Sequence, residues 1–504
     1  MANILVTIIF LPIFTCVSLR AISSEIKQNI VKIKKFRLLT IVITFAIRIY
    51  LWCNFDSSNH EYQFSSNFLN RNLMNFHLSI DGISLFFVCL TTFIIPVALL
   101  SNWKNINDNI KIFLITFLIL ERLLLLTFVV VDILLFYVFF ESVLIPLFLI
   151  VGIWGGSKVR VRAALLLFLY TLLGRLFILL AFLEINENVG STDYQIINVN
   201  EINVLNQSKL FICIFISIAI KTPLIPFNTW LTYAHAEAPV GGSIILAGLI
   251  LKLATYGYIR ILVQFLPDQC YYFSEIVQII AVITLIYASL SSLRQIDFKK
   301  LVAYSRVAHQ AIIVLGVFSN TLQGLEGAIL LGIAHGLVRP GLFFVCGGVL
   351  YDRHHTRIIK YYRGIATYMP IFSIFFFIFT ISNAAVPLSA NWIGEILCLI
   401  GIFQENAVVG VIASLGIVFS ACYSIYLFNR ICFFGIRKYT QIIKDVNRRE
   451  FILILPLIVI TIFIGIFPNV ILQDIHVRVS HLIYLFSYDC IIKKVNYHLI
   501  WIIW

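Results

Sequence analysis

The sequence predicts an all-α membrane protein that crosses the bilayer many times and has two helices broken within the membrane. Of its 504 residues, 61% are hydrophobic and only 12% carry a charge, a balance outside the range of soluble globular proteins. The apolar residues form repeated runs of about 20, the length at which an α-helix spans a bilayer. Two runs place proline beside a charged residue, which is typical of broken helices that line a polar cavity.

The length criterion gives about fourteen spans, separated by gaps that contain glycine, proline and charged residues. The N-terminal run lacks an Arg-rich amphipathic leader, so we interpret it as the first span and expect no transit peptide. The tail, residues 473–504, is too mixed to span and is expected to lie on the membrane surface. The approximate spans are 2–19, 36–53, 80–101, 112–131, 133–153, 163–183, 209–232, 240–265, 274–293, 300–318, 325–350, 369–390, 407–434 and 451–472.

Basic and non-basic loops alternate along this series of spans. With the spans counted in this way, all six basic loops lie on one side of the membrane, and the positive-inside rule places both termini on the other side. The net charge of +13 therefore orients the chain, and no nucleic-acid-binding motif accompanies it. The basic loops are residues 20–37, 104–111, 158–162, 294–300, 353–363 and 437–449.

The ten cysteines are scattered, mostly inside apolar runs, and none forms a CxxC pair. We expect them to be small buried hydrophobic residues. Motifs for flavin, nucleotide, zinc, haem or iron–sulfur clusters do not occur in the sequence, so no cofactor is expected in this chain.

Spans 7 and 12 each combine a charge, proline and tryptophan inside an apolar run. They lie five spans apart, and an odd offset reverses direction through the membrane, as in an inverted repeat with one broken helix per half. We therefore predict three N-terminal spans in 1–103, a first repeat (spans 4–8) in 110–265, a second (spans 9–13) in 272–434, and a last span with an amphipathic tail in 451–504. The residues that define the two spans are Lys221, Pro223, Pro226 and Trp230, and Asn383, Pro387, Trp392 and Glu395.

Six titratable residues lie within or beside the spans, in the order carboxylate, two lysines, two histidines, carboxylate. A charge in hydrocarbon costs roughly 2.5–3.5 kcal/mol on insertion scales, so such residues face a cavity or a partner and mark ion pathways. This row is the layout of a proton relay. The candidate relay residues are Glu141, Lys221, Lys252, His309, His335 and Glu395.

Each candidate also has a purely structural interpretation. Glu141 and Lys221 are expected to form a buried pair that either titrates as a unit or statically pins two helices. Lys252 either carries a proton or snorkels to the interface. The two candidate histidines either relay protons or form hydrogen bonds in the core. His235, beside Glu237 near a span end, is interpreted as structural.

Seven segments between residues 80 and 400 carry a family resemblance. In order, they are IDGISLFFVCLTTFIIP, DILLFYVFFESVLIPLFLIVGIWGG, AALLLFLYTLLG, the stretch from Lys221 to Gly257, LVAYSRVAH, GIAHGL and NWIGEILCLIG. They resemble chain 4 of respiratory NADH–ubiquinone oxidoreductase (complex I), an antiporter-like proton-pumping subunit. The resemblance implies fourteen helices with two inverted five-helix repeats. It also implies relay positions at Glu141, Lys221, Lys252, His335 and Glu395.

The resemblance also implies partners and a location. Proton translocation would be coupled to quinone reduction elsewhere in the complex, with FMN and iron–sulfur clusters in other subunits and ubiquinone bound outside this chain. The implied partners are the other membrane-arm subunits, including sibling chains 2 and 5, and membrane lipid such as cardiolipin. Frequent Ile, Phe, Asn and Tyr suits an AT-rich organelle genome. We therefore expect the mitochondrial inner membrane, with basic loops facing the matrix and both termini the intermembrane space; a bacterial plasma membrane is the alternative.

The main alternative function is a subunit of a multi-subunit sodium/proton antiporter, which shares the fold. Glu395 argues against it, because those relatives and the sibling chains resemble one another in carrying lysine there. The segment AHAEAP also resembles chain 4. A purely structural scaffold is a third class, but a row of buried charges is an expensive way to build one.

Several positions depart from the family pattern. Asn228 stands where the family has a histidine after the span-7 lysine, so water or His235 would have to replace that relay group. Three mid-span arginines, which we expect to be genuine and paired with Glu326 or cardiolipin, stand where relatives commonly have serine. The alternative is a codon translated with the wrong mitochondrial code. The three arginines are Arg175, Arg306 and Arg339.

Overall fold

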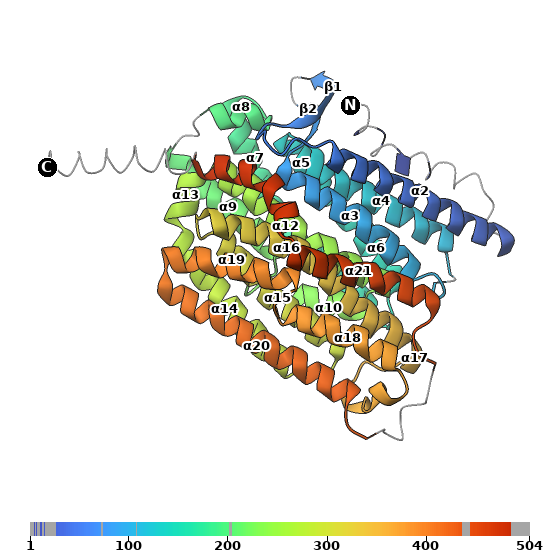
Figure 1. The fold of residues 1–504 in the computed structure, drawn as a ribbon. Helices are drawn as coiled ribbons and strands as arrows, with labels where there is room; N and C mark the ends of the chain where they lie inside the picture. The colour runs from blue at the N-terminus through green and yellow to red at the C-terminus, as the bar shows by residue number, and fades with distance from the viewer. Residues whose placement is uncertain are drawn as a thin grey trace.

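The computed structural model describes residues 5, 7, 11, 12 and 15, and residues 27–484 except 72–73, 107, 201–203 and 436–443. Most of the predicted span 2–19, and residues 485–504 of the predicted tail, lie outside the described residues. The described chain is a bundle of long helices with one small β-hairpin (Figure 1).

The N-terminal part contains two long helices, the hairpin, and the first helix of the predicted first repeat. The antiparallel strands are paired from Gln63 with Ile80 to Arg71 with Met74. This hairpin was not predicted, because residues 54–79 contain no long apolar run and fall between two predicted spans. The elements are α2 (Lys27–Cys53), β1 (Gln63–Arg71), β2 (Met74–Ile80), α3 (Gly82–Ser101) and α4 (Ile110–Val129).

The next elements cover the predicted spans 5–8. Two spans are interrupted: one at Val143, between two helices, and one between Lys221 and Thr229. The elements are α5 (Ile133–Ser142), α6 (Leu144–Trp154), α7 (Arg160–Val189), α8 (Tyr194–Val199), α9 (Val204–Lys221), α10 (Thr229–Glu237), α11 (Val240–Ile245), η1 (Leu246–Ile250), α12 (Leu251–Gly257) and η2 (Tyr258–Val263).

The remaining elements cover the predicted spans 9–14, and helical residues 469–484 follow them. The elements are α13 (Pro267–Tyr272), α14 (Ser274–Leu293), α15 (Phe298–Val317), α16 (Leu322–Phe343), η3 (Phe344–Leu350), α17 (Tyr351–His354), η4 (Ile359–Tyr361), η5 (Ile365–Thr367), α18 (Pro370–Asn383), α19 (Ala390–Glu405), α20 (Ala407–Cys432) and α21 (Arg448–Ile466).

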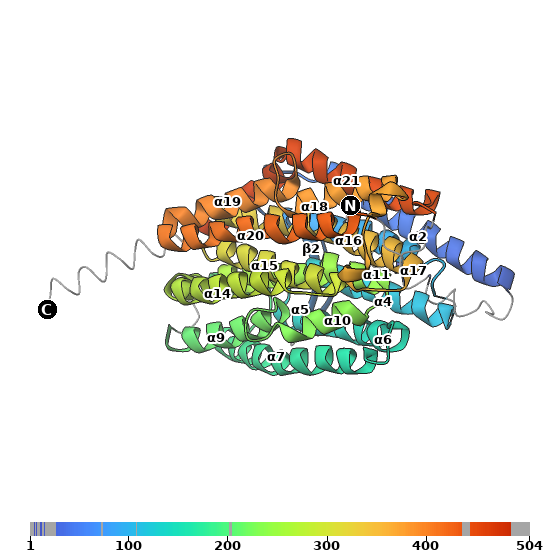
Figure 2. The ribbon, with the colours of Figure 1, turned by 90° about the horizontal axis from the view of Figure 1, so that it is seen from below.

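The helices are stacked in layers, from α7 and α9 at one face, through α14 and α15, to α19 and α21 at the other (Figure 2). Among the described residues, nine helices are long and apolar enough to cross a membrane. The predicted fold class is therefore confirmed. The count of fourteen spans and the two inverted repeats stay predictions.

Each of the two predicted broken helices is interrupted at its prolines, between Lys221 and Thr229 and between Asn383 and Ala390. At the first break, the indole Nε1 of Trp230 donates a hydrogen bond to the carbonyl of Ile220 at 2.9 Å. At the second, the side chain of Asn391 donates to the carbonyl of Ser382 at 2.8 Å. A helix end leaves carbonyls without intrahelical partners. In both breaks, a side chain from the second half-helix satisfies a carbonyl of the first.

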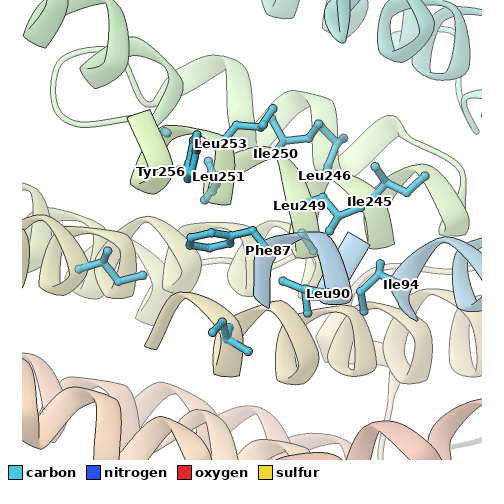
Figure 3. Close-up of a cluster of buried hydrophobic side chains, with 14 of the residues drawn as sticks. Phe87, Leu90, Ile94, Ile245, Leu246, Leu249, Ile250, Leu251, Leu253 and Tyr256 are labelled. Atoms are coloured by element: carbon cyan, nitrogen blue, oxygen red, sulfur yellow. The ribbon is translucent and has the colours of Figure 1, made fainter. Parts of the chain in front are cut away.

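The core encloses the segment that carries Lys252. Phe87, Leu90 and Ile94 of α3 face residues of α11, η1 and α12 (Figure 3). Phe87 stacks on Phe128 of α4, with ring centroids 5.4 Å apart. Residues of the spans Val240–Val263 and Leu322–His354 are buried by protein throughout their apolar windows. Charged residues on these two spans therefore meet other protein groups instead of lipid.

Candidate functional site

The first predicted pair is present and has a third member. Lys221 Nζ lies 3.1 Å from Glu141 Oε1, and Arg175 Nε lies 2.7 Å from Glu141 Oε2. The carboxylate side chain is only 7% exposed. An isolated buried charge is costly, and two cations on one carboxylate offset that cost.

The broken helix positions Lys221. It is the last residue of α9, where the partial negative charge of the helix C-terminus favours a cation. Its ammonium also donates to the carbonyl of Phe140 at 2.9 Å. Proline at 223 and 226 therefore explains both the end of the helix and the place of the charge.

Lys252 lies between two π-helical segments, η1 and η2, with a short α-helix around it. π-Helical turns are rare and occur frequently at functional sites. The side chain is buried, and its ammonium makes no hydrogen bond or ion pair with any residue that the structure describes. Arg306 and Arg339 act on it electrostatically. Lys252 is thus a buried amine among cations.

A small cavity extends from Lys221 towards the helix of Lys252. Its volume is about 20 Å³, and Ile250 and Leu253, which flank Lys252 in the chain, line it together with Thr171 and Lys221. A cavity needs roughly 10–15 Å³ to hold one water and also needs polar partners. The cavity therefore has room for one water molecule, with Lys221 and Thr171 as its polar neighbours.

The second cluster brings together the last three predicted residues. His309 Nδ1 lies 2.7 Å from Glu395 Oε1, and His335 Nε2 lies 4.0 Å from the same oxygen. The two imidazole rings are 4.8 Å apart, edge to face. Neither ring nitrogen of His335 has a hydrogen-bond partner within the described part of the chain. The carboxylate thus lies between one bonded and one unbonded imidazole.

Tyr423 of α20 completes this cluster. Its hydroxyl lies 2.7 Å from Nε2 of His309, so both nitrogens of that ring are engaged. Ligand atoms of His309, His335 and Glu395 lie within 4.8 Å of one another, a set that could also hold a metal ion. The same atoms are already arranged to share a proton, since the imidazole bonds directly to the carboxylate.

The three arginines that depart from the family pattern have different surroundings. The prediction that they pair with Glu326 is wrong. Glu326 instead bonds to His476 at 2.6 Å. Arg175 pairs with Glu141, as described above. Arg306 contacts the ring of His235 and the carbonyl of Leu246. Arg339 donates to the hydroxyl of Ser305 at 2.5 Å.

Asn228 and His235 lie in or beside α10. Asn228 is buried, and its Nδ2 has no hydrogen-bond partner among the described residues. His235 is fully buried and stacks on Phe343, with ring centroids 4.7 Å apart. The sequence placed His235 near a span end, and the structure adds its contact with Arg306.

Sequence reasoning missed other buried polar residues, including Glu121, Arg48 and Tyr423. Glu121 of α4 is fully buried, and Arg48 of α2 interacts with it electrostatically. Both stand inside apolar runs, so the criterion that selected Glu141 would also have selected them. Tyr423 offered no such signal, because a tyrosine in a span is ordinary.

The bundle with two broken helices and buried clusters of titratable residues is the architecture of an antiporter-like membrane subunit. Residues 130–420 match the family model described as "NADH:quinone oxidoreductase/Mrp antiporter, TM". A NADH-ubiquinone oxidoreductase chain 4 from Mycosarcoma maydis is 61% identical over 95% of this chain and 99% of its own length. The chain 4 from Chondrus crispus is 46% identical over 90% and 93%. The chain belongs to the NADH-ubiquinone oxidoreductase chain 4 family.

Solved structures agree with this assignment. A chain of "Respiratory complex I from Thermus thermophilus with bound NADH" superposes with a TM-score of 0.86 and 26% identity, covering 96% of this chain and 99% of that one. A chain of the archaeal membrane-bound sulfane sulfur reductase superposes with a TM-score of 0.84. At 19% identity and 95% coverage of this chain (99% of the other), the second match shows a shared fold.

Proposed function

We propose that this chain is a membrane-arm subunit of NADH–ubiquinone oxidoreductase and translocates protons through the two buried clusters and Lys252. The observation that carries the proposal is the arrangement of the buried titratable residues around Lys252. A carboxylate–lysine pair at one end and a histidine–carboxylate cluster at the other flank a buried lysine that has no ion-pair partner among the described residues.

Arg175 gives the first step a physical basis. If Lys221 were the only cation beside Glu141, its movement away would leave a buried carboxylate with no compensating charge. Here the guanidinium of Arg175 lies 2.7 Å from Glu141 and is a second cation for that carboxylate. Separation of Lys221 is therefore less costly, and the freed lysine can pass its proton on.

The middle step is the transfer from Lys221 to Lys252. The two lysines are on separate helices, and the cavity beside Lys221 reaches the residues that flank Lys252. The side chain of Lys252 does not line this cavity, so the transfer needs a further water molecule or a movement of one of the two lysine side chains. Arg306 and Arg339 act electrostatically on Lys252, and like charges repel, so a proton transferred to Lys252 can move on to the next group.

The last step uses the imidazole cluster. His335 interacts electrostatically with Lys252, and its ring lies beside His309. His309 bonds to Glu395, so a proton on the His309 ring can reach the carboxylate directly. A proton on His335 has 4.0 Å to cross to the same oxygen, so the ring has to move closer or use a water molecule. Glu395 is then the exit group.

The proposed assembly and location rest on the family of the chain. Relatives carry the name of a NADH-ubiquinone oxidoreductase subunit, so redox chemistry and its cofactors would reside in other subunits, and the sibling antiporter-like chains would be neighbours. We propose the mitochondrial inner membrane, with the basic loops in the matrix. The sodium/proton antiporter alternative is not favoured, because the relatives named chain 4 match nearly the whole chain.

Two measurements test the proposal. In native electrophoresis of mild-detergent extracts, the chain should migrate with a large NADH–quinone reductase; migration in a small assembly without NADH oxidation would contradict it. In the assembled complex, Glu141→Ala or Lys221→Ala should lower coupled turnover. Lys34→Ala is the matched control, since Lys34 donates to the carbonyl of Trp103, outside the clusters. Unchanged coupled turnover in an assembled Lys221→Ala complex would refute the relay.

A further inference from the structure

A buried cluster of charges lies outside the proposed relay. Asp81, the N-cap residue of α3, forms salt bridges with two arginines. Arg260 Nη2 lies 2.8 Å from Asp81 Oδ2, and Arg478 Nε lies 3.2 Å from the same oxygen. Asp81 is buried, and two guanidinium groups on its carboxylate offset the cost of burying the negative charge. One carboxylate thus joins two segments that are distant in sequence.

The first segment is the helix that carries Lys252. Arg260 is in η2, eight residues beyond Lys252, or roughly 12 Å at the rise of an α-helix. Between them, Tyr256 receives a hydrogen bond from Arg260 at 3.1 Å and donates one to the carbonyl of Phe128 at 3.2 Å. The π-helical turn that ends this span is therefore held at Asp81.

The second segment is the helix formed by residues 469–484. Besides Arg478, its Asp474 accepts a hydrogen bond from the indole of Trp52 at 2.9 Å. The carbonyl of Asp474 lies so close to Gly82 that a β-carbon there would overlap it. Only a glycine allows this approach. The helix is thus fixed to the start of α3 at the carboxylate that holds Arg260.

We propose that Asp81 is a positioning residue for Lys252 and that Arg478 links the C-terminal helix electrostatically to the relay. The inference rests on the proposed function. The three groups carry a net charge of +1, and the interior transmits that field to Lys252 more strongly than water would. Movement of the C-terminal helix would change how readily Lys252 keeps its proton.

Other charges also face Lys252 and set the background for this effect. Arg306 of α15 and Arg339 and His335 of α16 act on it directly. Its helix also packs against α9, which carries Lys221, and α4, which carries Glu121. None of these residues changes when Arg478 or Asp81 is replaced.

The test is the pH dependence of protons pumped per electron by the intact complex in proteoliposomes. Arg478→Met removes a positive charge, so Lys252 should hold its proton to higher pH, and the alkaline midpoint should rise by about 0.5–1 pH unit. Asp81→Asn removes a negative charge and should lower the midpoint by a similar amount. Loss of packing alone would not shift the two variants in opposite directions.

Further variants separate the possible results. Arg478→Lys, which keeps the charge, should restore the wild-type midpoint. Arg353→Met is the matched control, because Arg353 pairs with Glu450 at 2.7 Å between α17 and α21. The alkaline midpoint of this variant should not move.

If Asp81→Asn does not assemble, Arg478→Met alone decides: a rise in the alkaline midpoint supports the inference, and an unchanged midpoint overturns it. If Lys252→Met pumps normally, the proposed function fails; if it does not pump and the Arg478→Met midpoint is unchanged, only this inference fails.

Discussion

The three-membered cluster at Glu141 gives a prediction that single substitutions alone cannot test. We expect Lys221→Met and Arg175→Met to leave an assembled complex when made separately, because Glu141 keeps one cation in each case. The double variant leaves a buried carboxylate with neither cation. Variants that lack Lys221 should lose pumping. Arg175→Met should pump more slowly, because Lys221 then has to leave a buried carboxylate that has no other cation.

The magnitudes follow from the burial of the cluster. An uncompensated buried charge destabilises a fold by about 3–5 kcal/mol. Arg175 is 18% exposed, so its loss alone should cost about 1 kcal/mol, the upper range for a solvated pair. Loss of Lys221 alone should cost about 1–2 kcal/mol, since the pair is buried but Arg175 remains. The double variant should therefore exceed the sum of the single variants, as expected for residues that share a partner.

The assay is residual assembled complex after heating at graded temperatures, read on native gels, with pumping per electron measured in parallel. Residual complex should fall at clearly lower temperature in the double variant than in either single one. Additive losses would show that the two cations do not share Glu141. Normal pumping by assembled Lys221→Met would contradict the role of that lysine.

Two further predictions concern the other clusters. Tyr423→Phe removes the hydroxyl bonded to His309, and loss of one such hydrogen bond should slow coupled turnover about 3–10-fold without loss of assembly; an unchanged rate would show that the hydroxyl is not needed. Gly82→Ala should displace residues 469–484 at a cost of about 1–3 kcal/mol, seen as faster proteolysis of that helix, because a β-carbon would overlap the carbonyl of Asp474. Gly435→Ala, with open space around the added carbon, should be neutral, and equal proteolysis of the two variants would contradict the packing argument.

The sequence predicted the fold class and both broken helices because their signals are local. An apolar run of sufficient length, or a proline beside Lys221, needs no knowledge of the rest of the chain. The π-helical turns around Lys252 carry no comparable signal, since they depend on packing against neighbouring helices. The β-hairpin was missed although the second strand, MNFHLSI, alternates apolar and polar residues as a strand does. The first strand, QFSSNFLNR, lacks this alternation, and the search for long apolar runs passed over both.

The relay residues were predicted as a row, but their grouping was not. Sequence order suggested a continuous chain of groups, whereas the structure forms one cluster at Glu141 and another at Glu395, with Lys252 apart from both. Partners from distant helices decided this arrangement: Arg175 from α7 and Tyr423 from α20. Such contacts depend on tertiary packing, which a single sequence does not show. The roles of these residues stay predictions.

The most direct test of the account is the proton-to-electron ratio of the complex with Lys252→Met, measured in proteoliposomes with NADH and quinone. Within the described residues Lys252 makes no hydrogen bond or ion pair, so its replacement breaks no ion pair and should leave assembly intact. The account predicts a lower ratio of protons pumped to electrons transferred. A wild-type ratio in the assembled variant would contradict it.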